Sequence, residues 1–380
     1  MRFGRLIPFL VFTVVFCTGP CGGSVPSNQA AAPASAELPP PRPDATPSVV
    51  CYAMDSRAMG PSLTPRQEVV DQIVGVLVRA VTGKSSESEA WRSLVRPGDR
   101  VGIKVSALPG PVGGTHPAVV RSVVRGLEEA GIPSRDILVW DRRREDLTAC
   151  GYDTVPGLTL RWVENGEGYD PSVTVSAPAI GRLVYGDSAF RKSAADLDAL
   201  LGPREQLSEL SHLPVVLSRD VDKVIVIPSL CDSCFTGVHG ALAAMTVGCL
   251  DNWRRFGKGG GFGDAALAEV YSDPKVGGKV ILAIMDGLML QYAGGPYPAP
   301  GNCVVFSTLF ASKDPVAVDA AALRLLDEQR ELSRMPKASA DGGHVAEAES
   351  RGLGNADEKR IRMRRIGEGA PKGSPDHRGN

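Results

Sequence analysis

The sequence predicts an α/β fold with a mainly parallel sheet, helices on both faces, and a small β-hairpin insertion. The first observation behind this is that short apolar runs of strand length alternate with stretches whose apolar residues recur at helical spacing. The second is that no second linker-like stretch interrupts this alternation before about residue 366. Strands that alternate with helices are typical of parallel sheets, because each helix carries the chain back to begin the next strand in the same direction.

The first helix of the folded part is predicted after Thr64. We expect Thr64 to be its N-cap, with Pro65 at the first helical position and Gln67 completing a capping box. The apolar pattern that follows ends at Gly83, a residue type that commonly terminates helices.

The next three segments form one predicted βαβ unit. Residues 96–107 predict a turn and a strand, residues 115–132 a helix, and residues 135–141 a second strand. Further strands are predicted at 158–163, 222–228 and 278–286, and further helices at 236–248 and 314–328. Asp314 is the expected N-cap of the last helix. The more polar stretch 172–190 is interpreted as the hairpin insertion.

The N-terminal region differs from this core. Arg2 and Arg5 precede an apolar stretch of about twelve residues and then small residues, which is the layout of a secretory signal peptide and is too short for a comfortable membrane span. The segment behind it is rich in Ala, Pro and Ser, as in disordered spacers. The predicted organisation is a signal peptide at 1–22, a disordered spacer at 23–48, an α/β domain at 49–366 and a disordered tail at 367–380.

This organisation predicts an exported protein that is periplasmic, secreted or held at the cell surface. Cys21 lies where a lipid anchor would be attached, so a tether through this residue is one alternative. The 380 residues carry a formal net charge of -1, and basic residues come only in short clusters. This charge distribution lacks the footprint of a nucleic-acid-binding protein. We therefore expect no nucleic-acid partner, and membrane contact only through an N-terminal tether.

Polar residues at the strand ends predict one crevice. In open parallel sheets, ligands bind beyond the carboxyl ends of the strands, where loops converge and helix N-termini point inward. Lys104, Asp141 and Asp286 end three different predicted strands, and they are the predicted catalytic residues. The predicted ligand-binding residues lie in the adjacent turns and are Ser106, Thr115, His116 and Thr236.

The residue types suggest roles for this crevice. We expect Lys104 and the N-terminus of the helix at His116 to receive a small anionic ligand, and Asp141 or Asp286 to act as a general base or a metal ligand. Each residue also has a purely structural interpretation. Either aspartate can cap the turn that follows it, and Thr115 can be a helix N-cap.

Cys231 and Cys234 form a CxxC pair with three interpretations. A redox pair requires a thiolate stabilised by a helix N-terminus, whereas the helix is predicted to begin only near Thr236. A metal site would combine both cysteines with His239 and a carboxylate from a strand end. A disulfide or an unreactive pair is the interpretation we favour for an exported protein.

Three blocks of the sequence resemble the bacterial and archaeal domain-of-unknown-function family 362 (DUF362). They are VGIKVS with the helix and strand after it, IPSLCDSCFTGVHGAL, and IMDGLMLQYAGGPYP with FASKDPVAVDAAA. Together they span roughly residues 95–330. The resemblance implies an α/β domain, sometimes found beside iron–sulfur modules, with no agreed reaction.

The central block departs from the family pattern. In the family it reads close to Pro-Lys-Leu-Lys-Thr-His and later Ala-Leu-Lys-Asn, and those basic positions fall here on Ser229, Cys231, Ser233 and Ala243. The chain thus resembles a divergent member whose central Lys/His block is missing. A weaker similarity to the nickel-pincer lactate racemases covers the first βαβ unit, but no histidine set matches theirs, so their activity is not carried over.

Three functions stay open at this point. The first is an enzyme acting on a small anionic substrate in the crevice, which the charged strand ends favour. The second is a non-catalytic binding protein that kept the crevice, which the missing basic residues favour. The third is a thiol-disulfide or metal-binding protein that uses Cys231 and Cys234. A small molecule is the expected partner, and a metal ion is the one cofactor considered.

Overall fold

The computed structural model describes residues 46–163, 168–175, 211–251, 253 and 263–367. The predicted signal peptide, nearly all of the predicted spacer and nearly all of the predicted tail lie outside these residues. Ser48 opens the first strand, and the Thr46 carbonyl accepts a hydrogen bond from Asn355. Among the described helices, none has the length and apolar character needed to cross a bilayer.

One ten-stranded sheet organises the described part of the chain. Its main path, in order across the sheet, is β12 (Ile361–Arg365), β1 (Ser48–Met54), β11 (Cys303–Ser312), β10 (Val280–Gln291), β7 (Lys223–Ile227), β2 (Val101–Val105), β3 (Ile137–Asp141) and β4 (Thr159–Trp162). Off this path, β8 (Ser229–Ser233) pairs with β10 and with β9 (Gly237–Val238). Along the path every neighbouring pair is parallel, except that β11 runs antiparallel to both β1 and β10. The prediction of a mainly parallel sheet is therefore confirmed.

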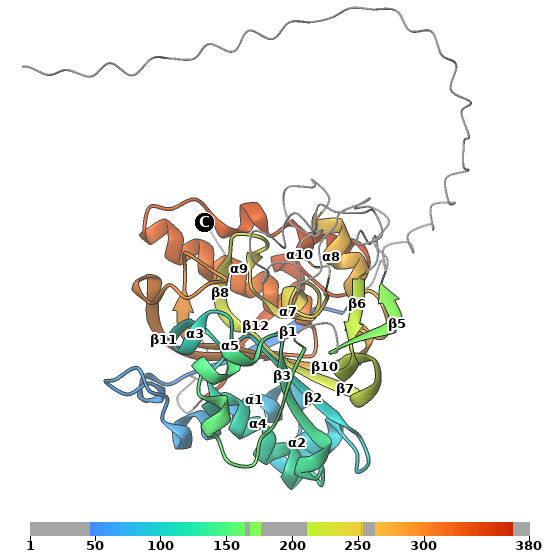
Figure 1. Ribbon diagram of the computed structural model, residues 1–380. Helices are drawn as coiled ribbons and strands as arrows, with labels where there is room; N and C mark the ends of the chain where they lie inside the picture. The colour runs from blue at the N-terminus through green and yellow to red at the C-terminus, as the bar shows by residue number, and fades with distance from the viewer. Residues whose placement is uncertain (1–45, 164–167, 176–210, 252, 254–262, 368–380) are drawn as a thin grey trace, which may run out of the picture. The chain divides into compact units, whose positions relative to one another are not determined.

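Helices cover both faces of this sheet, as Figure 1 shows. The helices on one face are α1 (Gln67–Thr82), α2 (Glu87–Leu94) and α4 (Pro117–Glu129). The helices on the other face are α7 (Ala241–Met245), α8 (Gly263–Tyr271), α9 (Pro315–Leu332) and α10 (Gly343–Ser350). Two short helices, α3 (Gly110–Gly113) and α5 (Arg144–Ala149), follow the carboxyl ends of β2 and β3.

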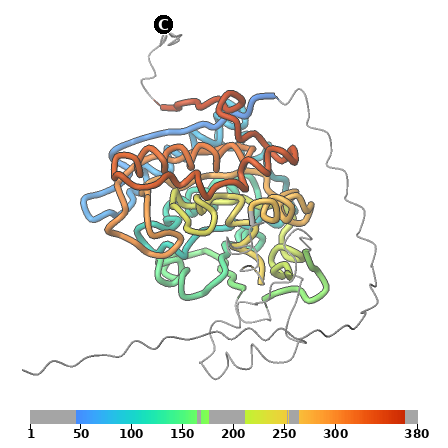
Figure 2. Tube along the Cα trace, turned by 90° about the horizontal axis from the view of Figure 1, so that it is seen from above, coloured from blue at the N-terminus to red at the C-terminus, as the bar shows by residue number. Residues whose placement is uncertain are grey.

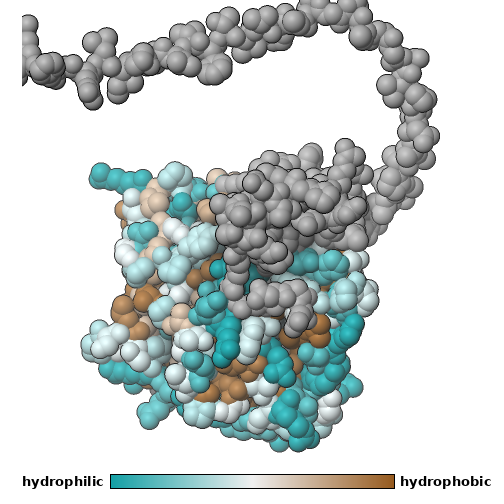
Figure 3. Space-filling model, in the orientation of Figure 1, coloured by the Kyte–Doolittle hydropathy of each residue, from teal (hydrophilic) through white to brown (hydrophobic). Residues whose placement is uncertain are grey.

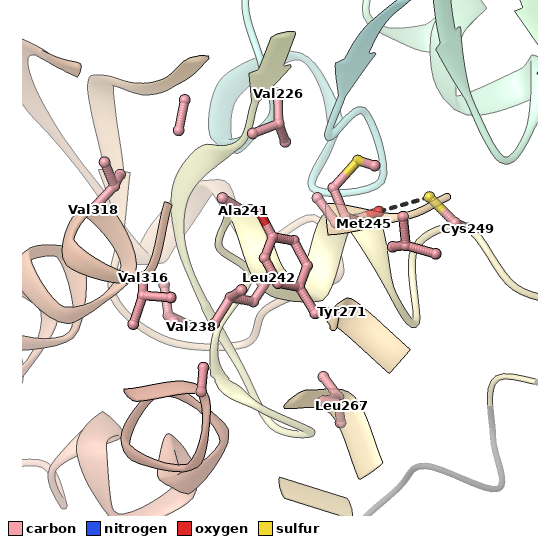
Figure 4. Close-up of a cluster of buried hydrophobic side chains, with 14 of the residues drawn as sticks. Val226, Val238, Ala241, Leu242, Met245, Cys249, Leu267, Tyr271, Val316 and Val318 are labelled. Atoms are coloured by element: carbon pink, nitrogen blue, oxygen red, sulfur yellow. Dashed lines mark hydrogen bonds between the residues drawn. The ribbon is translucent and has the colours of Figure 1, made fainter. Parts of the chain in front are cut away.

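The two faces carry separate apolar cores. Successive strand residues point to opposite faces, so the neighbours Ile225 and Val226 of β7 belong to different cores. Figure 4 shows the core beneath α7 to α9, in which Val226 belongs to the same cluster as Met245 of α7, Tyr271 of α8 and Val316 of α9. A strand buried on both faces reads as a continuous apolar run, which is why the sequence predicted β7 well.

The edge of the sheet formed by the first and last of the described strands was not predicted. Strands β1 and β12 lie side by side and parallel, as the blue and red traces of Figure 2 show. In β12 the residues after Ile361 are exposed and mostly Arg, and charge of this kind protects a sheet edge from further pairing. Such a strand, like the polar-interrupted β11, lacks an apolar run by which it could be recognised.

Two predicted helix starts are wrong. Helix α1 begins at Gln67 with Arg66 as its N-cap, and the Gln67 side chain reaches Asp71 across the first turn instead of closing a capping box with Thr64. The helix predicted at 236–248 begins at Ala241, because the preceding residues form β9 and its turn. The end of α1 at Gly83 and the Asp314 cap of α9 are confirmed.

The predicted hairpin insertion is represented by a separate two-stranded sheet. Strands β5 (Tyr169–Val175) and β6 (Ser211–Pro214) pair antiparallel. The predicted stretch 172–190 overlaps the end of β5, and its residues 176–190 lie outside the described residues.

Large apolar side chains that are exposed in the described part are dispersed. They include Trp162 and Tyr297, and on the face drawn in Figure 3 the brown apolar residues lie in separate groups between teal polar ones. Scattered apolar residues are normal at a protein surface and do not by themselves indicate a ligand site.

Candidate functional site

The carboxyl ends of β2, β3 and β7 meet at one edge of the sheet. Lys104 of β2 is paired in register with Trp140 of β3 and with Val226 of β7. Asp141 directly follows Trp140, so it lies one residue beyond Lys104 at the same edge. The sheet thus brings these two predicted residues together.

A pocket with a cavity volume of about 60 Å³ opens at this edge. Three residues singled out from the sequence line it, namely Lys104, Asp141 and His239. Other lining residues are Leu108, Arg142, Ser233, Phe235, Trp253, Pro296 and Tyr297. Since one buried water needs roughly 10–15 Å³ of such volume, the cavity has room for about four waters or for a group of a few heavy atoms.

The Lys104 ammonium is held in a fixed position at this pocket. The residue is only 1% exposed, and its Nζ donates to the Val105 carbonyl at 2.8 Å and to Asp141 Oδ1 at 2.6 Å. The Nζ atom also lies 5.2 Å from the centroid of the Trp140 ring, in a cation–π contact. An ammonium has three N–H donors, so one donor remains for a group in the pocket.

Asp141 holds this lysine in place. Its Oδ1 accepts a further hydrogen bond from Arg142 N at 2.8 Å, and its Oδ2 accepts one from Ala107 N at 2.7 Å. These backbone donors satisfy the carboxylate in a site where an incompletely paired charge would be costly. Because its oxygens already accept three hydrogen bonds, Asp141 positions Lys104 and is not free to act as the general base that we expected.

His239 brings a neutral imidazole to the same pocket. Burial and the nearby Lys104 and Arg142 cations lower its pKa to about 4, and the opposing effect of Asp141 is smaller. Its backbone N–H donates to the Cys231 carbonyl at 2.9 Å, whereas its ring makes no hydrogen bond to any residue in the described part of the chain. A neutral imidazole offers one donor and one acceptor, and both are available to a ligand.

Arg142 and Trp253 were not predicted as site residues. Arg142 Nη2 donates to the Val247 carbonyl at 2.5 Å and to the Leu250 carbonyl at 2.6 Å, and its guanidinium stacks 5.1 Å from the Trp253 ring centroid. The Trp253 ring meets Phe235 edge to face, with centroids 5.6 Å apart. Arg142 could have been found as the neighbour of Asp141, but Trp253 lies in a stretch without any periodic signal.

Asp232 supports another part of the pocket wall and was also not predicted as a site residue. It is buried, its Oδ1 accepts the Gly295 N–H at 2.8 Å, and its Oδ2 lies 3.6 Å from Arg330 of α9. This contact fixes the turn that carries Pro296 and Tyr297 to the pocket. A Cβ atom at Gly295 would overlap the Asp232 backbone carbonyl, so only glycine allows this approach.

Asp286 does not line this pocket, which corrects the prediction. It shares a side of β10 with Ile284 and Leu288, which belong to the core beneath α1 and α4, whereas Lys104 pairs with residues of the opposite core. Its Oδ2 accepts the backbone N–H of His116 at 2.7 Å and lies 2.9 Å from His116 Nδ1. The carboxylate thus occupies the N-terminus of α4, the place where we expected an anionic ligand.

Two other predicted ligand-binding residues, Thr115 and Thr236, use their hydroxyls in hydrogen bonds to the backbone. Thr115 Oγ1 accepts the Ser106 N–H at 3.0 Å and donates to the Ile227 carbonyl at 2.6 Å. His116, and not Thr115, is the N-cap of α4, and it makes no side-chain cap. Thr236 Oγ1 donates to a carbonyl two residues later. Since none of these residues lines the pocket, their predicted contact with its ligand is not supported.

The CxxC pair is not bonded in the structure. Cys231 is buried in β8, Cys234 is exposed, and no disulfide joins the two. Burial, and then the nearby Asp232, raise the pKa of the Cys231 thiol well above its usual range. With α7 beginning only at Ala241, no helix N-terminus adjoins the pair to favour a thiolate.

The three predicted metal ligands are also not assembled. Among the described residues, no group of three or more His, Cys, Asp or Glu side chains is arranged to hold a metal ion. The Cys231 Sγ contacts the Asp232 carbonyl at 3.2 Å, and His239 faces the pocket. The metal interpretation of Cys231, Cys234 and His239 therefore has no ligand set in this part of the chain.

Residues 101–324 match the family model described as "Domain of unknown function (DUF362)". This protein belongs to DUF362. The match begins at β2 and ends within α9, so it contains most of the residues that line the pocket. Three positions where the family resemblance implied basic residues, Ser229, Cys231 and Ser233, form buried parts of β8. In this DUF362 protein the lysine at the pocket is Lys104, from the first block.

Comparison with other proteins adds little to this assignment. None of the curated proteins matches the chain. Among solved structures, a crystal structure of a protein from Thermotoga maritima is 13% identical, with a TM-score of 0.37. The match covers 71% of the present chain and 60% of that protein, so the chain spans less than two thirds of its length.

Proposed function

We propose that this DUF362 protein binds a small organic anion in the pocket at the carboxyl edge of β2 and β3, and that Lys104 and His239 contact it. The observation that carries the proposal is the buried Lys104–Asp141 ion pair at the pocket wall. A buried ion pair is often no more stabilising than apolar residues of similar volume, so stability alone does not account for it. Titratable groups in unusual environments inside a cleft are typical of functional sites.

The hydrogen-bonding groups favour an anion over a cation. Lys104 has one N–H donor left for the pocket, and the neutral His239 ring can present another. The lining side chains include three basic residues, Lys104, Arg142 and Arg143, against the carboxylates of Asp141 and Asp146. Because Asp141 is already paired with Lys104, it does not repel an incoming anion as a free carboxylate would.

The same groups can support catalysis by proton transfer. A neutral imidazole can accept a proton from a bound substrate, and a neighbouring ammonium can stabilise the negative charge that develops. On this proposal His239 is the general base and Lys104 the electrostatic stabiliser, while Asp141 keeps Lys104 in position.

A non-catalytic binding protein is the second candidate. The observation in its favour is that neither aspartate expected as a base is free, since Asp141 and Asp286 both direct their oxygens at backbone N–H groups. Both candidates require the same anion site, so its existence is tested first. The thiol-disulfide alternative has little support, because Cys231 is buried with a raised pKa.

The experiment is an NMR titration with acetate as the probe. The amide signals of Leu108 and His239 should shift and saturate in the wild type, and the shifts should disappear in Lys104→Met. The matched control is Lys223→Met, because Lys223 is also ion-paired, at 2.8 Å from Asp99, but opens β7 at the other edge of the sheet. The control should bind acetate as the wild type does.

Removing Lys104 alone leaves Asp141 buried without its partner, which costs about 3–5 kcal/mol. If that variant does not fold, the double variant Lys104→Met/Asp141→Asn removes both charges and replaces it. Absence of saturable shifts in the wild type, or unchanged binding in the folded lysine variant, contradicts the proposal.

We also propose that the protein is exported, on the strength of its charged and then apolar N-terminal sequence. Mass spectrometry of the protein from its native host should find a mature chain that begins after about residue 22, or one that is lipid-modified at Cys21. An intact, unmodified N-terminus in the cytoplasm would contradict export.

A further inference from the structure

We infer that the ligand of this pocket is amphiphilic, with a carboxylate-like anion at the base and an apolar, ring-sized body at the mouth. This inference rests on the proposed function and names the class of ligand. It is drawn from the way polar and apolar side chains are distributed with depth in the pocket.

Lys104 and His239 are the deeper groups of the pocket, whereas its aromatic side chains lie nearer the surface. Lys104 is 1% exposed and His239 is 8% exposed. Phe235 and Trp253 are half-buried, and Tyr297 is 44% exposed. A ligand that enters this pocket therefore meets the aromatic side chains, together with the half-buried Arg142, before it reaches Lys104 and His239.

The cavity volume decides which part of a ligand can reach the base. An engineered cavity that encloses a benzene ring measures about 150 Å³, whereas this one measures about 60 Å³. A carboxylate or another group of a few heavy atoms fits within it, but a ring does not. A larger apolar body must therefore stay at the mouth, where the aromatic side chains are.

One wall of the mouth is built in advance of binding. The Trp253 ring is stacked on Arg142, whose Nη2 is anchored to the carbonyls of Val247 and Leu250, and it also packs edge to face with Phe235. A wall held in this way loses little side-chain entropy when a ligand covers it. The guanidinium also keeps positive charge near the path along which an anion enters.

The test compares three probes by isothermal titration calorimetry: acetate, benzoate and uncharged benzamide. We expect benzoate to bind about tenfold more tightly than acetate, because partial burial of the ring adds apolar contact area. Benzamide should bind at least tenfold more weakly than benzoate, because it lacks the charge that Lys104 receives.

Two variants test whether the benzoate ring binds at the mouth of the pocket. Trp253→Ala should weaken benzoate binding severalfold and leave acetate binding unchanged. If this variant does not fold, Tyr297→Ala replaces it, because Tyr297 lies on an exposed turn, and the same result is expected. The matched control is Trp162→Ala, since Trp162 also stacks on an arginine, at 4.9 Å from Arg144, but does not line the pocket. This control should bind benzoate as the wild type does.

The outcomes separate the inference from the proposed function. Equal affinities for acetate and benzoate, both lost in Lys104→Met, would overturn the amphiphilic ligand and leave the anion site standing. The same holds if Trp253→Ala and Tyr297→Ala both bind benzoate normally. No saturable binding of acetate or benzoate, or benzamide binding as tightly as benzoate, would overturn the anion site itself.

Discussion

Asp319 should make the stability of this protein depend on pH. Its carboxylate is fully buried in α9 and accepts hydrogen bonds from Ala241 N at 2.7 Å and Leu242 N at 2.9 Å, at the start of α7. Gly240 permits this approach, because a Cβ atom there would overlap the carboxylate. Burial raises the pKa of Asp319 from 3.8 to about 7, against the smaller opposing effect of the two N–H donors.

The raised pKa fixes the sign of the effect. Between about pH 4 and pH 7 the folded state keeps a proton on Asp319 that the unfolded state releases, so stability falls as pH rises. The stabilising contribution is complete below the unfolded value of 3.8 and is lost as pH rises through about 7. The difference between these two values, at about 1.4 kcal/mol per pH unit, corresponds to about 4 kcal/mol.

Urea denaturation of the wild type and of Asp319→Asn, at intervals from pH 4 to pH 8, measures this contribution. Asparagine has the same shape and no charge, so the free-energy difference between the two proteins cancels the other titrating groups. The variant should lose one N–H acceptor, at about 1 kcal/mol at low pH. As the pH rises towards 8, the free energy of unfolding of the variant should rise by about 4 kcal/mol relative to that of the wild type. A difference that stays constant across this range would refute the reasoning.

Three further predictions concern residues of the site and its supports. Asp286→Ala should lower the free energy of unfolding by about 3 kcal/mol or more, because it removes the acceptor at the N-terminus of α4. The folded variant should bind acetate as the wild type does. Loss of acetate binding with normal stability would contradict this. At pH 7 a thiol reagent should modify Cys234 readily and Cys231 only on unfolding, as peptide mapping would show, and faster labelling of Cys231 would be inconsistent with its burial. Gly240→Ala should cost about 2 kcal/mol in urea denaturation, because the new Cβ displaces Asp319; a loss below about 0.5 kcal/mol would show that the carboxylate has room to move.

Sequence patterns were sufficient where a strand is buried on both faces and its neighbours are parallel. The runs around Val139 and Ile225 are apolar, and the run around Ile103 is interrupted only by Gly102 and Lys104; β2, β3 and β7 were predicted from them. Parallel strands present their carboxyl ends at one edge, so the proximity of Lys104 and Asp141 followed from strand ends alone.

The side to which a strand-end residue points was not predictable in the same way. The predicted β10 stopped at Asp286, but the strand continues to Gln291. A residue inside a strand belongs to one face, and Asp286 therefore caps α4 instead of entering the pocket. The position of a residue within its strand, and not only its distance from the edge, decides whether it reaches a ligand.

The residues of the pocket walls could not be predicted from the sequence, for a different reason. Phe235, Trp253 and Tyr297 come from turns and irregular segments whose conformations depend on tertiary contacts. The side chains of Asp232 and Arg142 hold two of these segments: Asp232 accepts the Gly295 N–H, and Arg142 donates to the Val247 carbonyl. Contacts of this kind join residues far apart in the chain and leave no periodic signal in the sequence.

A crystal structure with 4-bromobenzoate tests the central claim most directly, because anomalous scattering locates the bromine without ambiguity. We predict a carboxylate within hydrogen-bonding distance of Lys104 Nζ and the His239 ring, with the bromine at the mouth beside Trp253. A bromine found only at other places on the protein, or a pocket that stays free of the ligand at saturating concentration, would contradict the account.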